Sequence, residues 1–306
     1  MRKFNRSKLG SLKNNIVSTN TIKRYEFALL FFFEWLKQTR ETLATRFGAL
    51  DEQVGTCVDY LWLEGEPKGI AGDLLSAFHH FVPALSRSRL PGAWRLFSAW
   101  GKHELPFRAF PLLPYHVKAM GMRRFRAGDL KFGVLLMIGF DCMLRGGELM
   151  SLQKRDFKLN NAEGKGVIEL RSTKSGKRYG GNELVVIQDR SIVSLLGLIL
   201  AKLEPGDFIF EGSYYGFRKK FTECLKDVNL WPGDFTPHSL RRGGATHDFR
   251  SHGDLYRTQI RGRWSSSKTA RLYINEGVSL LSEIDSAPSL VNKWTTDAAT
   301  FDKLFV

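Results

Sequence analysis

The chain has 306 residues, of which 43% are hydrophobic and 12% aromatic, and this composition excludes a disordered protein. Its formal net charge of +15 favours a polyanion as partner. The longest apolar segment, residues 132–140, is too short to cross a bilayer, and the basic first residues lead into no apolar segment, so we expect neither a membrane partner nor secretion.

The N-terminal third is predicted to be helical. Residues 1–17 are basic and polar, and we expect a flexible arm. Residues 18–20 can cap a helix, and further helical patterns cover residues 51–63 and 70–85. The apolar stripe of the first helix consists of Tyr25, Leu29, Phe32, Phe33 and Leu36. We interpret this stripe as one face of a helical bundle that ends in a Pro-containing linker at residues 105–114.

The remainder alternates between helical and extended patterns. Residues around 167–169 and 184–187 are predicted to form two strands that flank a Gly-containing turn at residues 173–178. Residues 192–203 predict a buried helix, Ser213 caps another, and Thr236 with Pro237 begins a third. The expected fold is therefore mainly α with a small β-hairpin or sheet in the second domain, which makes that domain α+β.

Three short segments place chemically active side chains at defined spacings. They are Thr236-Pro237-His238-Ser239-Leu240-Arg241, then Arg261-Gly262-Arg263-Trp264-Ser265-Ser266, then Arg271-Leu272-Tyr273. His238 and Arg241 share one helix face. An indole follows 23 residues after Arg241, and a phenol nine residues after that. An accidental match to this pattern is expected in roughly 3 of 10,000 chains of this composition.

This order resembles the tyrosine recombinase, or phage integrase, family. The resemblance covers residues 18–276. It rests also on Leu144-Arg145-Gly146-Gly147-Glu148-Leu149, which matches the family's R-x-x-E-L, on a lysine-bearing turn, and on a weaker helical match from Thr21 to Trp35. It implies a helical DNA core-binding domain at residues 18–108, a catalytic domain at 109–276, and a tail at 277–306 that in the family often docks into a neighbouring protomer.

The resemblance also implies catalytic roles. Two guanidinium groups would clamp the scissile phosphate, because arginine stays charged and makes bidentate contacts. A turn lysine would protonate the leaving 5′-oxygen, with Lys174 preferred and Lys177 as its competitor. An imidazole would hydrogen-bond the phosphate or help to remove the proton of the nucleophile. An indole, which cannot shuttle a proton, would donate to a phosphate oxygen. A phenol would attack the phosphorus. The implied catalytic residues are Arg145, Lys174, His238, Arg241, Trp264 and Tyr273, with Glu148 as a supporting residue.

Further basic residues crowd the same segments. We interpret them as contacts to the DNA backbone, which provide affinity without reading sequence. They are Arg242, Arg257, Arg261, Arg263, Arg271 and Lys177. The excess positive charge is +6 in residues 1–110 and +11 in residues 111–276, while residues 277–306 carry −2. His247 and His252 lack a carboxylate or Cys at ligand spacing, so we expect no metal site there.

The resulting hypothesis is a site-specific DNA recombinase or integrase that forms a 3′-phosphotyrosyl intermediate without metal, ATP or another cofactor. The alternatives are a type IB topoisomerase-like enzyme and a catalytically idle, recombinase-derived DNA-binding protein. The expected partner is double-stranded DNA, bound by a homo-tetramer on paired sites, with a monomer possible off DNA. Scattered cysteines suit a reducing compartment, and we expect an intracellular, DNA-associated protein, in the nucleus or the nucleoid. The target sequence and the direction of recombination stay open.

Overall fold

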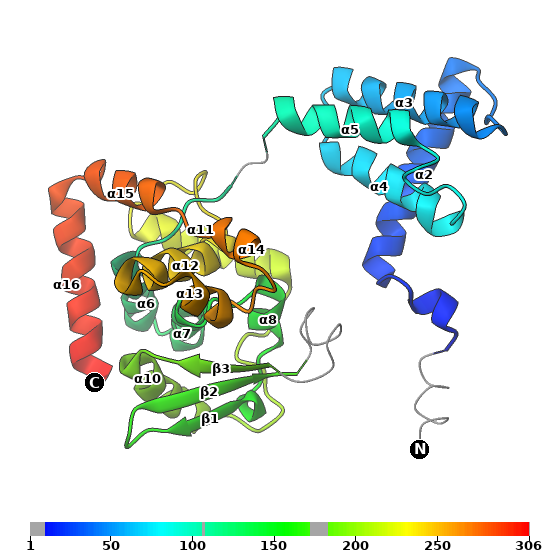
Figure 1. The fold of residues 1–306 in the computed structure, drawn as a ribbon. Helices are drawn as coiled ribbons and strands as arrows, with labels where there is room; N and C mark the ends of the chain where they lie inside the picture. The colour runs from blue at the N-terminus through cyan, green and yellow to red at the C-terminus, as the bar shows by residue number, and fades with distance from the viewer. Residues whose placement is uncertain (1–9, 106–107, 172–182, 306) are drawn as a thin grey trace. The chain divides into compact units, whose positions relative to one another are not determined.

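The structure is a computed structural model that describes residues 10–105, 108–171 and 183–305. The chain divides into two compact units, Met1–Phe107 and Arg108–Val306, called here the N-terminal unit and the C-terminal unit (Figure 1). None of the helices in the described ranges is long and apolar enough to cross a membrane. Each unit has its own hydrophobic core.

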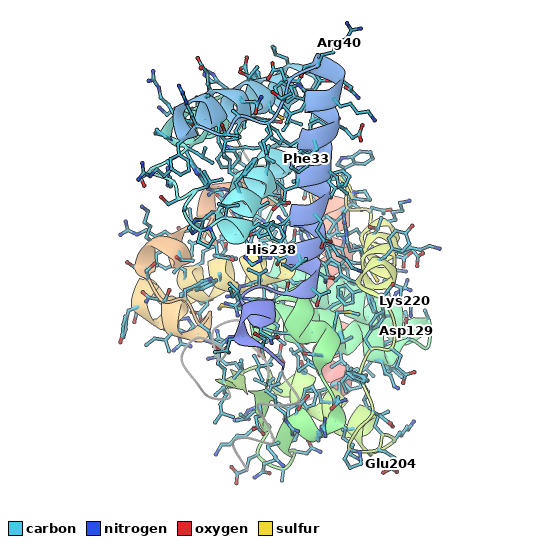
Figure 2. The ribbon with its side chains drawn as sticks, turned by 90° about the vertical axis from the view of Figure 1, so that its right-hand side faces the viewer. Phe33, Arg40, Asp129, Glu204, Lys220 and His238 are labelled. Atoms are coloured by element: carbon cyan, nitrogen blue, oxygen red, sulfur yellow. The ribbon has the colours of Figure 1, made fainter. Side chains whose placement is uncertain are left out.

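The N-terminal unit is a helical bundle, as predicted. After the short 3-10 turn η1 (Leu12–Asn15), its elements are α2 (Thr19–Thr39), α3 (Phe47–Leu63), α4 (Lys68–Phe81) and α5 (Pro91–His103). Ser18 caps α2 by accepting a hydrogen bond from the backbone of Thr21. The predicted stripe was wrong at Phe33, which is 46% exposed (Figure 2). Phe32 is buried, as predicted, and Trp35 is buried as well. Helix α2 packs against α4.

Helix α5 was not among the predicted elements. Pro91 occupies its first turn, where the missing N–H costs no hydrogen bond. Asp51 on α3 accepts hydrogen bonds from the backbone of Gly92 (2.8 Å) and Ala93 (2.9 Å). The capping carboxylate therefore comes from another helix, 41 residues earlier, and no local sequence pattern announces it.

The C-terminal unit surrounds one helix whose central residues are all apolar. Its elements are α6 (Pro114–Arg126), α7 (Leu130–Asp141), α8 (Gly146–Ser151), η2 (Lys154–Asp156), β1 (Phe157–Asn160), β2 (Lys165–Leu170), β3 (Glu183–Ile187), α10 (Arg190–Leu200), α11 (Tyr214–Asp227), α12 (His238–His252), α13 (Leu255–Arg261), α14 (Ser267–Arg271), α15 (Glu276–Ile284) and α16 (Pro288–Phe305). Residues 132–140 of α7 are all buried, and α6, α10 and α12 pack around them. The longest apolar segment of the sequence is thus the centre of this core.

The small sheet extends the predicted hairpin by one strand. The described strands are antiparallel in the order β1-β2-β3, with Ile168 opposite both Phe157 and Val185 (Figure 1). Ile168 and Ile187 face the core. The expectation of a mainly α fold with a small sheet in the second domain is confirmed. The predicted turn at residues 173–178 lies outside the described residues.

The segment predicted as the linker is partly integrated into the C-terminal unit. The backbone of Phe110 donates to Asp234 (2.8 Å), and that of Leu112 donates to Ser239 at the start of α12 (3.3 Å). Leu112 and Leu113 are buried. The chain therefore joins this unit before α6 begins.

The tail packs on its own chain. Helix α16 lies against α6 and α10, and Trp294, Phe301 and Phe305 are buried there (Figure 1). Lys118 on α6 pairs with Asp302 at 2.5 Å. Docking of the tail into a neighbouring protomer stays a prediction. Helix α15 carries exposed apolar side chains, Leu280, Leu281 and Ile284.

His116 sits beneath α16 and makes the stability of this unit sensitive to acid. The ring is fully buried, Nδ1 accepts from the backbone of Leu113 (3.3 Å), and the ring packs on Trp294 with centroids 4.5 Å apart. Burial lowers the pKa of His116 to about 3. The unfolded chain binds this proton near pH 6.5. We therefore expect His116 to remove about 1.4 kcal/mol of stability per pH unit as pH falls from about 6.5 towards 3.

Urea unfolding of the C-terminal unit at a series of pH values measures this slope. The variant His116→Gln should flatten it, whereas His79→Gln, which changes an exposed histidine of the N-terminal unit, should not. An unchanged slope in His116→Gln would contradict the assignment.

Candidate active site

Arg145 is held in place by the residue that follows it three positions later. It is not inside a helix but directly precedes α8 as its N-cap residue. Glu148 accepts from the backbone N–H of Arg145 at 2.8 Å and from its Nη1 at 2.5 Å. The Glu148 side chain is 5% exposed and that of Arg145 is 31% exposed. The carboxylate therefore fixes a guanidinium group that still reaches solvent.

Gly146, which follows Arg145, is required by close packing. A Cβ at this position would lie 2.9 Å from the ring of Tyr214 on α11. Glycine has a low helix propensity, so Gly146 and Gly147 weaken the start of α8. The close approach of Tyr214 gives a packing reason for Gly146. Tyr214 thereby covers the backbone that presents Arg145.

Arg241 is the most enclosed charge of the site. It is fully buried on α12, and its Nη2 donates to the carbonyl of Gly262 at 2.6 Å while Nη1 donates to the carbonyl of Met143. Met143 has a left-handed backbone (φ 48°), which turns the chain between α7 and Arg145. Burial lowers the pKa of Arg241 to about 10, with nearby arginines adding to the effect, so the group is still cationic at neutral pH. Its Nε is buried without a hydrogen-bond partner.

His238 begins α12 one turn before Arg241. Its ring centroid lies 5.2 Å from that of Tyr273. Desolvation lowers the pKa of His238, and the positive charges of three nearby arginines lower it further, although part of the side chain remains exposed. The imidazole is therefore more strongly biased towards the neutral form at neutral pH than an isolated histidine.

Trp264 and Tyr273 pack against each other beside Arg241, with their rings tilted by 36°. Their ring centroids are 4.6 Å apart, and the Cζ of Arg241 lies 4.7 Å from the centre of the indole and 5.3 Å from that of the phenol ring. Trp264 is 7% exposed, and its Nε1 is buried without a hydrogen-bond partner. The indole N–H therefore has no acceptor among the described residues.

Tyr273 is anchored to the helix that carries His238 and Arg241. It follows α14, and its backbone N–H donates to Ala270 at 2.9 Å. Its carbonyl accepts from the hydroxyl of Thr246 on α12 at 3.4 Å. The phenol is thus delivered to the cluster by its own chain. Tyr256, a nearby tyrosine that lacks the spacing to Trp264, is 70% exposed on α13.

The predicted lysines are the part of the site that the structure does not describe. Lys174 and Lys177 both lie outside the described residues, so the choice between them stays a prediction. The structure brings together the other five predicted catalytic residues. Within the described ranges, no group of three or more His, Cys, Asp and Glu side chains is arranged to hold a metal ion.

Three of the arginines predicted to contact DNA have partners inside the protein. Arg242 donates to the carbonyl of Leu272 at 2.8 Å, and Arg261 pairs with the buried Asp248 at 2.5 Å. Arg263 pairs with Glu148 at 2.7 Å. These internal contacts help to hold the site together, and contact of the same side chains with DNA stays a prediction. Arg271 is exposed.

Arg257 has both an internal partner and an exposed side chain. It lies 3.4 Å from Asp248, and its side chain is 37% exposed. Asp248 also accepts a hydrogen bond from Thr258 at 2.7 Å, so it ties α13 to α12. Sequence reasoning missed Met143, Thr246 and Asp248, because nothing in their local sequence shows that side chains far along the chain meet them.

No family model matches the sequence, and no curated protein matches it. Solved structures do match. A complex of the Tn1549 transposon integrase with transposon right end DNA has a TM-score of 0.60 and 14% identity, with 94% of this chain and 96% of that chain covered. The XerH site-specific recombinase bound to its difH substrate has a TM-score of 0.55 and 20% identity, with 87% and 79% covered. A lambda integrase dimer bound to a COC′ core site has a TM-score of 0.58 and 15% identity, with 86% and 74% covered.

These neighbours are tyrosine recombinases and integrases, and they cover most of the chain. At this level of identity the likeness concerns the fold. The chain therefore has the fold of the tyrosine recombinases, which confirms the fold that the sequence motifs imply.

Proposed function

We propose that this chain is a site-specific DNA recombinase or integrase that cuts and rejoins strands through a covalent intermediate on Tyr273. The observation that carries the proposal is the packing of Tyr273 against Trp264, His238 and Arg241. A phenol next to a buried guanidinium, an imidazole and an unpaired indole N–H combines a nucleophile with groups that bind a phosphate.

The proposed cleavage is a transesterification. The phenolic oxygen of Tyr273 attacks the phosphorus, the bond from phosphorus to the 5′-oxygen breaks, and a 3′-phosphotyrosyl link forms. His238, biased towards its neutral form, can accept the phenolic proton. Lys174 gives a proton to the departing 5′-oxygen, with Lys177 as the other candidate. Arg145 and Arg241 balance the charge that develops on the non-bridging oxygens.

Religation is the reverse reaction. The 5′-hydroxyl of another strand attacks the phosphotyrosyl link, a new phosphodiester forms, and Tyr273 regains its proton. One ester is exchanged for another of similar energy, so the reaction needs no ATP. The protein's own cations supply the positive charge, so the proposed mechanism requires no metal or other cofactor.

The proposed partner is double-stranded DNA. Both units carry excess positive charge, and the solved neighbours described above are complexes with DNA. Exposed Arg271 and half-exposed Arg257 remain our candidates for contacts to the DNA backbone. We propose a homo-tetramer on paired sites, in which the exposed apolar residues of α15 contact a neighbouring protomer. We also propose that the protein is associated with DNA inside the cell.

The test uses a pool of duplexes with randomised sequence around a nick, because the target site is unknown. Cleavage just upstream of a nick releases a short fragment and prevents religation. We expect an adduct that survives detergent, is destroyed by protease, and carries the protein on a 3′ end. Absence of any adduct from a pool that the protein binds would overturn the proposed function. Relaxation of supercoiled plasmid without strand exchange between two recovered sites would favour the topoisomerase alternative.

A further inference from the structure

Helix α13 ends in a motif that normally uses glycine. The backbone N–H of Trp264 donates to Gln259 (3.1 Å) and that of Arg263 donates to Ile260 (3.0 Å), which is the pair of hydrogen bonds of a Schellman ending. The second of these donors, Arg263, has a left-handed backbone (φ 56°). Glycine adopts this conformation without a steric penalty, whereas a side chain makes it unfavourable. We therefore expect the side chain of Arg263 to make contacts that offset this backbone penalty.

The side chain of Arg263 is directed into the protein. It is 9% exposed, its Nη2 donates to Glu148 at 2.7 Å, and its Nε lies 3.2 Å from a carboxylate oxygen of Glu183. Glu183 is the first residue of β3. The guanidinium thus joins the carboxylate that holds Arg145 to the strand that follows the lysine-bearing segment.

These contacts hold Glu148 from two sides. Glu148 is shared between Arg145 and Arg263, so one buried carboxylate faces two guanidinium groups. Glu183 balances the positive charge of Arg263. Without Arg263, Glu148 would be held by Arg145 alone, and the orientation of Arg145 would be less tightly fixed.

We propose that Arg263 is a positioning residue, which acts through Glu148 to keep Arg145 oriented for the reaction. The inference rests on the proposed function, because Arg145 must clamp a phosphate for the effect to be measurable. It assigns to the left-handed arginine of α13 a role distinct from contact with DNA. A residue that only ended the helix would be replaced by glycine without loss.

The test compares Arg263→Gly with Arg40→Gly. Arg40 ends α2 in the same left-handed conformation (φ 59°) but is exposed in the N-terminal unit (Figure 2). Both changes relieve the same backbone penalty. The measured quantities are the single-turnover rate of adduct formation at saturating nicked DNA, with a site recovered from the randomised pool, and the Kd for that DNA. We expect Arg263→Gly to lower the rate about a hundredfold with little change in Kd, because a misplaced reacting group costs that much. Arg40→Gly should leave the rate at saturating DNA unchanged.

A second comparison protects the test against simple misfolding. Removing Arg263 leaves the buried Glu148 with one cation fewer, so the double variant Arg263→Gly with Glu148→Gln also removes that charge. If Arg263 acts through Glu148, Arg263→Gly should change the rate by no more than about twofold in the Glu148→Gln background. A full loss in that background, or a rate within about twofold of wild type for Arg263→Gly alone, would overturn the inference. Absence of an adduct with the wild-type protein would instead overturn the proposed function itself.

Discussion

Replacement of Tyr273 by Phe should abolish the covalent adduct while DNA affinity stays close to that of the wild type. The phenol supplies the oxygen that attacks phosphorus, and neighbouring side chains can supply only charge and hydrogen bonds. The ring itself is kept in Tyr273→Phe, so its packing on Trp264 and its place beside Arg241 are preserved. Gel shift with the recovered site measures binding, and denaturing electrophoresis of the nicked substrate measures the adduct.

The matched control is Tyr256→Phe. Tyr256 lies on the neighbouring α13 and is 70% exposed, so loss of its hydroxyl should leave adduct formation unchanged. Equal amounts of adduct from wild type and Tyr273→Phe would remove Tyr273 from the role of nucleophile.

Replacement of Arg145 by Ala should lower the single-turnover rate by about a hundredfold to a thousandfold, as loss of a preorganised charge does in other active sites. The guanidinium is fixed by Glu148 through both its backbone and side chain, so little reorganisation is needed when the phosphate arrives. Arg145 is the better target than Arg241, because Arg241 also joins the carbonyls of Met143 and Gly262 inside the protein. A lower rate in an Arg241 variant would therefore not distinguish a loss of catalysis from a loss of folding.

Arg190→Ala provides the control for Arg145→Ala. Arg190 is an exposed arginine in the first turn of α10 and takes no part in the cluster. Its loss should leave the rate unchanged at saturating DNA. A loss of tenfold or less in Arg145→Ala, which corresponds to about 1.4 kcal/mol, would contradict the assignment of Arg145 as a phosphate clamp.

The sequence predicted elements whose signals are local. Ser18 and Ser213 cap the helices expected of them, and the apolar residues 132–140 form a buried helix. Local patterns failed where distant contacts decide the outcome. Phe33 fits the helical stripe of α2 but points away from α4, and the cap of α5 is supplied by Asp51 on another helix. Strand β1 is four residues long, too short to show a clear alternation.

The same distinction holds at the site. The spacings of His238, Arg241, Trp264 and Tyr273 predicted a cluster because α12 carries the first two, and only the short helices α13 and α14 separate them from the others. The burial and the partners of the remaining arginines could not be predicted in this way. Arg263 contacts Glu148 across 115 residues of sequence, and no local pattern distinguishes a buried arginine from an exposed one. Its left-handed backbone has no local signal either, since glycine is the residue expected there.

The central claim is that Tyr273 becomes joined to DNA, and mass spectrometry of the purified adduct tests it most directly. After digestion with nuclease and protease, we expect a nucleotide on the peptide that contains Tyr273, linked through the phenolic oxygen to a 3′-phosphate. A nucleotide on any other residue, or a protein joined to the 5′ end of the cleaved strand, would contradict the account.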